Sequence, residues 1–322
     1  MGVAGSRKKQ VRQVFAGGSL SRCACPLDPV RVRVVKQVGN RKTQTAAITM
    51  NILLAYTYPA MPAPTPHRFP SGKTLPEELC AAMKRIEACG VVYPAGYYRA
   101  LLEKYTRDGV LYPHILMILG QPRISNHFFY SRALKNTGRL LDYGCGTGDN
   151  VRQLIRDGFP RERITAFDVN RASIDLGFDL YRDEEEIGDL FIVSETFPFG
   201  PAEFDMVYSA SVFHVIADEG ELGTYLANAY SALRPGGVLF GSTLGLVEGA
   251  AARSLGERGP PRVMPGEELA AYLTGAGFIR PEMVQRYHVP HHVSDRSDDM
   301  CVFEFCTKKA VRKRQGPAYL HG

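Results

Sequence analysis

The chain has neither a disulfide framework nor a long apolar run. Its 322 residues include seven cysteines, an odd number without a Cys-x-x-Cys pair. Small disulfide-stapled proteins are thereby excluded, and reduced thiols in the cytoplasm are expected. Cys23 and Cys25 lack a second pair of ligands, so no metal site is predicted. The most apolar stretch of the N-terminal region, residues 46–56, is too short and polar to span a bilayer.

Acidic residues are nearly missing from the N-terminal region. Residues 1–76 hold twelve Lys or Arg and a single acid, Asp28, a net charge of +11. The remaining 27 basic and 32 acidic residues give −5, so the overall +6 comes from the N-terminal region. The rest of the chain has no positive excess that would favour nucleic acid. Residues 1–73 are predicted to be a disordered basic extension.

Two targeting patterns occur in this extension. Residues 1–6 match the loose N-myristoylation pattern, and the basic residues 7–9 would supply a second, electrostatic membrane signal. The acid-poor, arginine-rich composition also resembles a mitochondrial presequence. The favoured alternative is an extension without a targeting role, or a true start at Met50 or Met61.

A glycine-rich segment follows the first predicted strand. Residues 142–149 have the sequence Asp-Tyr-Gly-Cys-Gly-Thr-Gly-Asp, between an apolar run and a segment with helical spacing. A strand, a glycine turn and a helix together cradle nucleotide-like ligands. A dinucleotide fingerprint starting at Gly144 would need a glycine at position 149, where Asp149 stands. A tight turn without a ligand is the alternative.

Four further segments follow in the order of an α/β domain. The runs ending at Asp168 and at Glu195 predict a second and a third strand, each with a carboxylate at its end. The predicted fourth strand covers residues 204–209, and residues 233–240 predict a helix end, a turn and a fifth strand. Helical segments lie between residues 75 and 135, and two late strands are expected at 283–289 and 300–306.

The glycine segment resembles motif I of class I S-adenosylmethionine (SAM) methyltransferases, in which an acidic residue stands two places before the first glycine. Other segments narrow the likeness: residues 112–115, 140–145, 152–158, 176–183 and 211–214. Together they resemble fungal methyltransferases of secondary metabolism, above all those that esterify the carboxylate of prenylated aromatic acids on the way to meroterpenoids. The likeness covers residues 75–310. One departure is Asp149-Asn150, where Gln-Asp is expected.

This resemblance implies a doubly wound, Rossmann-like α/β fold. Seven strands are expected in the order 3-2-1-4-5-7-6, the last one antiparallel, with an N-terminal helical cap. The cap would comprise residues 74–137, the SAM-binding domain residues 138–309, and a C-terminal tail residues 310–322. Aromatic cap residues such as Tyr112, Phe128, Phe129 and Tyr130 would either line an apolar pocket or pack in the core.

The resemblance also implies a cofactor, SAM, and a set of binding residues. Asp142 would face the ligand's ammonium group, and the turn glycines would allow close approach of the backbone. A carboxylate at the second strand's end suits the ribose hydroxyls, and the third strand's end suits the adenine amino group. The predicted cofactor-binding residues are Asp142, Gly144, Gly146, Gly148, Asp168, Val169, Glu195, Thr196 and Ser209.

His214 is the candidate catalytic residue, because it follows the fourth strand where the methyl group should lie. It would orient the acceptor oxygen or take its proton; a neutral packing histidine is the alternative. His288, His291 and His292 are expected to be solvated rather than metal ligands. The predicted function is O-methylation of a small, largely apolar acceptor in terpenoid or meroterpenoid biosynthesis, with the carboxylate of a prenylated aromatic acid favoured.

Three alternative functions stand against this one: two stay open, and one is disfavoured. A phenol or hydroxyl O-methyltransferase of polyketide-type products is the nearest alternative, and a non-catalytic SAM-binding subunit is another. Nucleic-acid methylation is disfavoured, because residues 209–212 lack an Asn/Asp-Pro-Pro-Tyr motif. The expected partner is a small-molecule acceptor, with a homodimer left open.

Overall fold

The computed structural model describes residues 72–110, 115–248, 262–286 and 300–311. The predictions for the basic extension, the C-terminal tail, Tyr112 and the three late histidines lie outside these residues. Among the described residues, no helix is long and apolar enough to cross a membrane.

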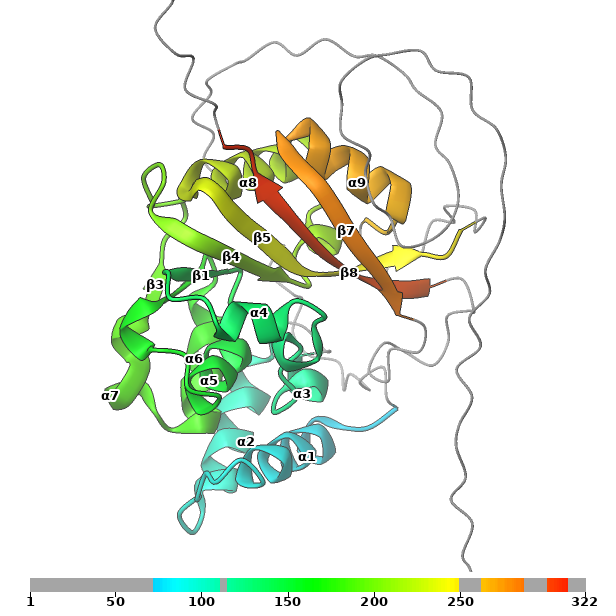
Figure 1. Cartoon of the computed structure of the whole chain (residues 1–322). Coiled ribbons are helices and arrows are strands. Elements are labelled where there is room, and N and C mark those ends of the chain that lie inside the picture. Colours follow the sequence, from blue (N-terminus) through cyan, green and yellow to red (C-terminus); the bar gives the residue numbers. More distant parts are fainter. Residues whose placement is uncertain (1–71, 111–114, 249–261, 287–299, 312–322) are drawn as a thin grey trace, which may run out of the picture.

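Helices and strands alternate along most of the described chain (Figure 1). The helices are α1 (Leu75–Glu87), α2 (Tyr97–Asp108), α3 (Ile115–Ile118), α4 (Tyr130–Leu134), α5 (Asp149–Arg156), α6 (Arg171–Tyr181), α7 (Glu184–Ile187), α8 (Glu219–Ala232) and α9 (Gly266–Gly275). The strands are β1 (Leu140–Tyr143), β2 (Ile164–Asp168), β3 (Phe191–Val193), β4 (Phe204–Ala210), β5 (Leu233–Leu246), β6 (Met264–Pro265), β7 (Phe278–Arg286) and β8 (Met300–Lys309).

The strands form one sheet in the order β3-β2-β1-β4-β5-β8-β7, with the short β6 pairing beside β5. Strands β1 to β5 pair in parallel, and β8 is antiparallel to both of its neighbours. Without β6, this order is the predicted 3-2-1-4-5-7-6 with an antiparallel last strand. The predicted doubly wound α/β fold is confirmed. The carboxyl ends of β1, β2 and β4 lie along one edge, where such sheets bind ligands.

Each face of the sheet has its own buried core. Helices α8 and α9 cover one face, where Leu226 and Leu273 are fully buried against the sheet. Helices α4, α5 and α6 cover the other face (Figure 1), where Leu154 is fully buried. Burial on both faces explains why the parallel strands are nearly continuous apolar runs in the sequence.

A smaller core joins the N-terminal helices to the sheet domain. The backbone N–H of Thr74 donates to the Glu77 carboxylate at 2.7 Å, as part of a capping box that begins α1. Leu79 and Ile86 of α1 are fully buried in a cluster that also holds Leu176 and Leu180 of α6. Helices α1, α2 and α3 therefore pack on α6, the helix that follows β2, away from the sheet itself (Figure 1).

Strands β7 and β5 depart from the prediction at their N-terminal ends. Strand β7 begins at Phe278, five residues before the predicted start, because a register shift between Ile279 and Glu282 breaks the alternation that marks a strand. Strand β5 includes the predicted turn, since its pairing with β4 jumps from Leu233 to Val238. Gly236 in that insertion has a φ of +82°, which glycine adopts without strain.

Candidate functional site

The glycine turn after β1 holds three glycines in left-handed conformations. The φ angles of Gly144, Gly146 and Gly148 are +77°, +54° and +76°. A Cβ on Gly144 would lie 2.4 Å from a methyl carbon of Val212, and one on Gly148 would lie 2.6 Å from the Phe191 ring. A Cβ on Gly146 would meet nothing within 4 Å. The outer two glycines thus serve packing, whereas Gly146 faces open space that a ligand can approach.

Asp142 ends β1 directly before this turn and has an unusual environment. Its side chain is 1% exposed, and neither carboxylate oxygen has a hydrogen-bond partner. Burial, with the nearby charges of Asp168 and Asp149, raises the pKa of Asp142 to about 8. A buried carboxylate without partners is costly, so it marks a place where a cation or a donor from a ligand is missing.

Asp168 ends β2 and faces the glycine turn. Its Oδ2 accepts a hydrogen bond from the Gly146 N–H at 2.8 Å, and its Oδ1 accepts one from the Asn170 N–H at 2.9 Å. Burial raises the pKa of Asp168, against the opposing effect of these backbone donors. Each carboxylate oxygen can accept more than one hydrogen bond, so Asp168 retains the capacity to bind two hydroxyl groups.

The other predicted cofactor residues lie at the same edge but differ in orientation. Glu195 and Thr196 are exposed and follow β3, whose Val193 is the register partner of Asp168. Val169 is half-buried against the core on the α8 side. The buried Ser209 hydroxyl pairs with the Tyr225 hydroxyl at 2.8 Å, also toward α8. Asp142 and Asp168 therefore flank the turn, whereas the Ser209 side chain points to the opposite face of the sheet from Asp142.

His214 lies just beyond β4, in a short 3₁₀ turn (Phe213–Val215), and is 6% exposed. Its Nδ1 accepts a hydrogen bond from the Leu244 N–H at 3.2 Å and lies 3.1 Å from the Thr243 hydroxyl. A backbone N–H can only donate, so Nδ1 carries no proton when this bond is made, and the neutral ring's proton sits on Nε2. In this tautomer His214 is a hydrogen-bond donor through Nε2, and its Nδ1 is already engaged.

The family-specific segment Leu176–Asp183 supports the glycine turn from behind. A Cβ on Gly177 would lie 2.1 Å from the Thr147 carbonyl oxygen, so only glycine lets α6 approach the turn this closely. The Tyr181 hydroxyl donates to Asp149 at 2.6 Å. Asp183 accepts two hydrogen bonds of 2.7 Å from Arg152 of α5. The segment's residues thus hold the turn in place rather than bind a ligand.

The same segment also anchors the cap. The Asp179 carboxylate pairs with Lys104 and accepts a hydrogen bond from Tyr105, both on α2. Asp149 adds a second tie, since its Oδ1 accepts a hydrogen bond from the Gly120 N–H at 2.7 Å. The sequence singles out Asp149 only because it excludes a dinucleotide fingerprint and departs from the family pattern. The structure instead makes it the link between the glycine turn and the cap.

Sequence patterns did not reveal two polar residues on and near β4, the strand beside Asp142. Tyr208 of β4 is fully buried, and its hydroxyl has no hydrogen-bond partner. Arg123, from the loop between α3 and α4, reaches the Ser211 hydroxyl just after β4. Tyr208 stands in an apolar strand pattern, and Arg123 lies 88 residues from Ser211, so neither gave a sequence signal.

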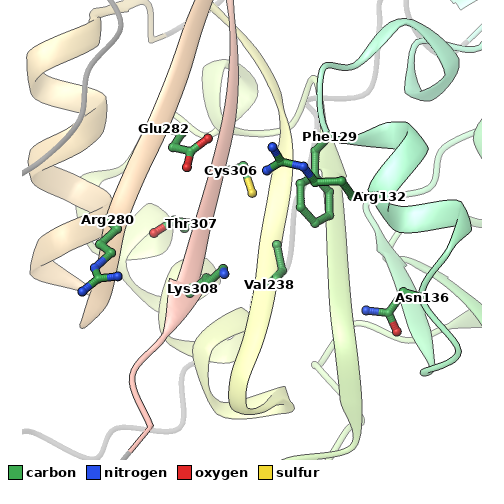
Figure 2. A pocket seen from close by; sticks show the side chains of 9 residues that line it. All are labelled: Phe129, Arg132, Asn136, Val238, Arg280, Glu282, Cys306, Thr307 and Lys308. Atoms are coloured by element: carbon green, nitrogen blue, oxygen red, sulfur yellow. The ribbon is translucent and has the colours of Figure 1, made fainter.

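A separate cavity lies at the other end of the sheet. It has a volume of about 330 Å³ and opens between α4 and strands β5, β7 and β8 (Figure 2). Figure 2 shows Arg132, Arg280 and Lys308 among its lining side chains. It contains none of the predicted site residues. Within the described ranges, no cluster of three or more His, Cys, Asp or Glu residues is arranged to hold a metal ion.

Comparison with known proteins agrees with this site. Residues 140–237 match the family model described as "Methyltransferase domain". The O-methyltransferase phiE of a fungal species is 28% identical over 115 residues, covering 33% of this chain and 38% of the relative. The methyltransferase adrK of Penicillium rubens is 34% identical over 89 residues, covering 26% and 32%. The chain thus spans about a third of the length of these relatives.

One more curated relative and one solved structure are also similar to this chain. The asnovolin E/chermesin D methyltransferase nvfJ of Aspergillus novofumigatus is 30% identical over 87 residues, covering 25% of this chain and 31% of the relative. Among solved structures, phosphoethanolamine N-methyltransferase 2 of Haemonchus contortus has a TM-score of 0.42 at 20% identity, covering 53% of this chain and 48% of that one. That likeness is too low to add to what the strand order shows.

The match of residues 140–237 to the methyltransferase domain model and the strand order both agree with the resemblance to class I SAM methyltransferases. The predicted resemblance to fungal methyltransferases of secondary metabolism is confirmed. The implied cofactor is SAM, which carries a positive sulfonium, an ammonium group and a ribose diol. The unpartnered Asp142 carboxylate, the open approach at Gly146 and the carboxylate of Asp168 fit these groups.

Proposed function

We propose that this protein is a SAM-dependent O-methyltransferase acting on a small, largely apolar acid. The observation that carries the proposal is the Asp142 carboxylate, buried without a partner beside the glycine turn. The cationic nicotinamide ring of NAD has no N–H on its charged nitrogen to donate to this carboxylate, whereas SAM carries an ammonium group that can donate and a sulfonium besides. Asp142 would hold the ammonium group, Asp168 the ribose diol, and the Gly146 backbone would border the ligand.

The favoured acceptor is the carboxylate of a prenylated aromatic acid. When bound, SAM supplies a methyl group on a sulfonium, and transfer to a carboxylate oxygen yields a methyl ester and S-adenosylhomocysteine with no proton to remove. A carboxylate is ionised at neutral pH and needs no base, while a phenol with a pKa near 10 benefits from one. The His214 tautomer supports the carboxylate, because Nδ1 is engaged by Leu244 and Nε2 carries a proton.

Two proposals concern the setting of the protein. A cytoplasmic location accords with the five unpaired cysteines among the described residues, Cys80, Cys89, Cys145, Cys301 and Cys306. The division into a cap at 74–137 and a SAM-binding domain at 138–309 also stays a proposal. Sedimentation of the purified protein would decide between a monomer and a homodimer.

The test is calorimetric titration with SAM, followed by transfer of a labelled methyl group. We expect SAM to bind and NAD, the dinucleotide control, not to bind. Farnesylated dihydroxybenzoic acid should then receive the label, and the corresponding phenol without the carboxyl group should receive little. Labelling of the phenol instead would support the hydroxyl O-methyltransferase. SAM binding without transfer to any acceptor would favour the non-catalytic subunit, and absence of SAM binding would refute the proposal.

A further inference from the structure

Three polar atoms without hydrogen-bond partners lie together beneath the carboxyl edge of the sheet. They are both carboxylate oxygens of Asp142 and the hydroxyl of Tyr208. The two residues are register partners on β1 and β4, so their side chains leave the same face of the sheet. Neighbouring strands are about 4.8 Å apart, which puts the two side chains side by side. Unpaired buried polar atoms are rare, and three in one place indicate a ligand position.

The Tyr208 hydroxyl is suited to donate a hydrogen bond and unsuited to act as a base. Burial raises the pKa of Tyr208 well above its usual value, and the charge of Asp142 acts in the same direction. Arg123 and Ser242 oppose this shift, although no hydrogen bond of normal geometry joins the Ser242 hydroxyl to Tyr208. Tyr208 therefore keeps its proton at neutral pH and presents it to whatever lies beside Asp142.

The cap places a cation at the carboxyl end of β4, where its charge acts on this hydroxyl. Arg123 is half-buried and pairs with the Ser211 hydroxyl, and its positive charge lowers the pKa of Tyr208. Ser211 has a φ of +61°, an uncommon conformation for a residue other than glycine. Its N–H donates to the Ser242 carbonyl at 2.8 Å, which fixes the chain in this conformation. Backbone strain of this kind is typical of ligand-binding positions.

We propose that Arg123 and the Tyr208 hydroxyl form a carboxylate-binding site, with Ser211 orienting the guanidinium. A guanidinium and a neighbouring O–H offer parallel donors that match the two oxygens of a carboxylate. A cationic ligand group would instead be repelled by Arg123 and attracted by Asp142. The site is therefore divided: the Asp142 side takes a positive group and the Arg123 side a negative one.

This inference rests on the proposed function, and two ligands there carry the carboxylate. One is the methyl acceptor, and the other is SAM, whose amino-acid end bears both an ammonium and a carboxylate. The chemistry recognised by Arg123 is the same in both cases. The two sources are separated by probes that lack only this group: decarboxylated SAM, and the phenol that corresponds to the aromatic acid.

The experiment compares Arg123→Met and Tyr208→Phe with the wild-type protein. Calorimetry measures the affinities for SAM and decarboxylated SAM, and then for farnesylated dihydroxybenzoic acid and its phenol in the presence of S-adenosylhomocysteine. We expect a carboxylate-bearing probe to bind roughly 10- to 150-fold more weakly to Arg123→Met, as for loss of a charge-assisted hydrogen bond. The matching probe without a carboxylate should bind as it does to the wild-type protein.

Matched controls separate this effect from damage to the fold. Arg132→Met removes an exposed arginine from α4, and Tyr230→Phe removes a hydroxyl from α8; neither should change any of the four affinities. Tyr208→Phe should not lower the melting temperature, because the deleted hydroxyl has no partner. Arg123→Lys, which keeps the charge without the planar fork, should fall between Arg123→Met and wild type.

The outcomes are distinct. Loss of affinity for SAM but not for decarboxylated SAM assigns the site to the cofactor's carboxylate. Unchanged SAM affinity with weaker binding of the acid alone assigns it to the acceptor. Equal effects on probes with and without a carboxylate, or no Arg123-dependent effect on any probe, overturn the inference while leaving SAM binding intact. A wild-type protein that does not bind SAM would instead overturn the proposed function.

Discussion

Two buried aspartates stand at opposite ends of the glycine turn. Asp142, before the turn, is 1% exposed and makes no hydrogen bond through either oxygen. Asp149, after the turn, is 9% exposed and accepts hydrogen bonds from the Gly120 N–H at 2.7 Å, the Tyr181 hydroxyl at 2.6 Å and the Thr147 hydroxyl at 2.5 Å. Both aspartates are buried, but the Asp149 carboxylate accepts three hydrogen bonds and the Asp142 carboxylate accepts none.

The difference separates a residue used for folding from a residue kept for a ligand. Asp149 ties α5, α6 and the cap together, so its carboxylate stabilises the turn's position. Asp142 gives the fold nothing that compensates its desolvation, because a buried unpaired carboxylate opposes folding. Stability alone would not retain such a group. Substitutions at the two aspartates should therefore have opposite consequences for stability and for ligand binding.

The largest effect is expected for SAM binding by Asp142→Asn. Removing one partner of a buried charge pair weakens binding by about 3–5 kcal/mol. Calorimetry at pH 8.5 is the measurement, since the wild-type carboxylate is then largely ionised. Asp149→Asn is the control and should lower the affinity far less. Similar losses in both variants would contradict the separation of roles.

The second effect is a pH dependence of stability that belongs to Asp142. Its pKa is about 8 in the folded protein, above the usual 3.8, so the folded state keeps a proton that the unfolded state releases. The stability that this raised pKa contributes to the folded state is fully present below pH 4 and is lost as the pH rises to 8. Between pH 6 and 8, the wild-type free energy of unfolding should fall by about 2 kcal/mol relative to Asp142→Asn.

Urea unfolding at both pH values for both proteins measures this difference. The variant removes the ionisable carboxyl but keeps its volume, so the other titrating groups cancel in the comparison. A difference that does not change with pH would show that Asp142 has a partner in solution. Proton release on SAM binding at pH 7, measured in two buffers of different ionisation enthalpy, is the corresponding test on the ligand side.

The third effect concerns stability and Asp149. Asp149→Ala leaves the three donors without their acceptor, and we expect a loss of about 2–3 kcal/mol in the free energy of unfolding. Asp149→Asn keeps one acceptor oxygen and should lose less. Thermal unfolding of both variants measures the melting temperature, and urea unfolding measures the free energy of unfolding. A melting temperature equal to that of wild type would remove Asp149 from the structural network.

The fourth effect concerns Asp168, which combines the features of Asp142 and Asp149. It accepts hydrogen bonds from two backbone N–H groups, and its oxygens can still accept hydrogen bonds from a ligand. Asp168→Ala should weaken SAM binding by about 2 kcal/mol, the worth of charge-assisted hydrogen bonds to a ribose diol. The variant must first be shown to fold, since it also loses the bond to Gly146. Unchanged affinity in a folded variant would exclude Asp168 from the site.

The smallest effect is expected for His214. Gln keeps a hydrogen-bonding side chain of similar reach, so His214→Gln should lower the rate of carboxylate methylation by less than about tenfold, with little dependence on pH. Initial rates between pH 6 and 9 are the measurement. If His214 were the base for a phenol, the loss would be on the order of 10²–10⁴-fold and would shrink at high pH. That result would establish phenol O-methylation.

The sequence alone determined the sheet and the glycine turn. Apolar runs that end in carboxylates at Asp142 and Asp168 predict parallel strands, and the resemblance to class I methyltransferases implies their order in the sheet. Spacing also separated the turn from a dinucleotide fingerprint through the single residue Asp149. Where alternation was broken, as between Ile279 and Glu282, the predicted strand was too short.

Only the tertiary structure decided which of these residues have partners. The sequence does not show that Asp142 lacks partners and that Asp149 is saturated, since saturation depends on donors from Gly120 and Tyr181, which lie about 30 residues away in opposite directions along the chain. Pairing of β1 with β4 brings Tyr208 beside Asp142, and packing of the cap brings Arg123 to Ser211. A hydrogen-bond partner is a property of position in space. Sequence spacing predicts it only within a turn or a helix, where the backbone fixes which residues are neighbours.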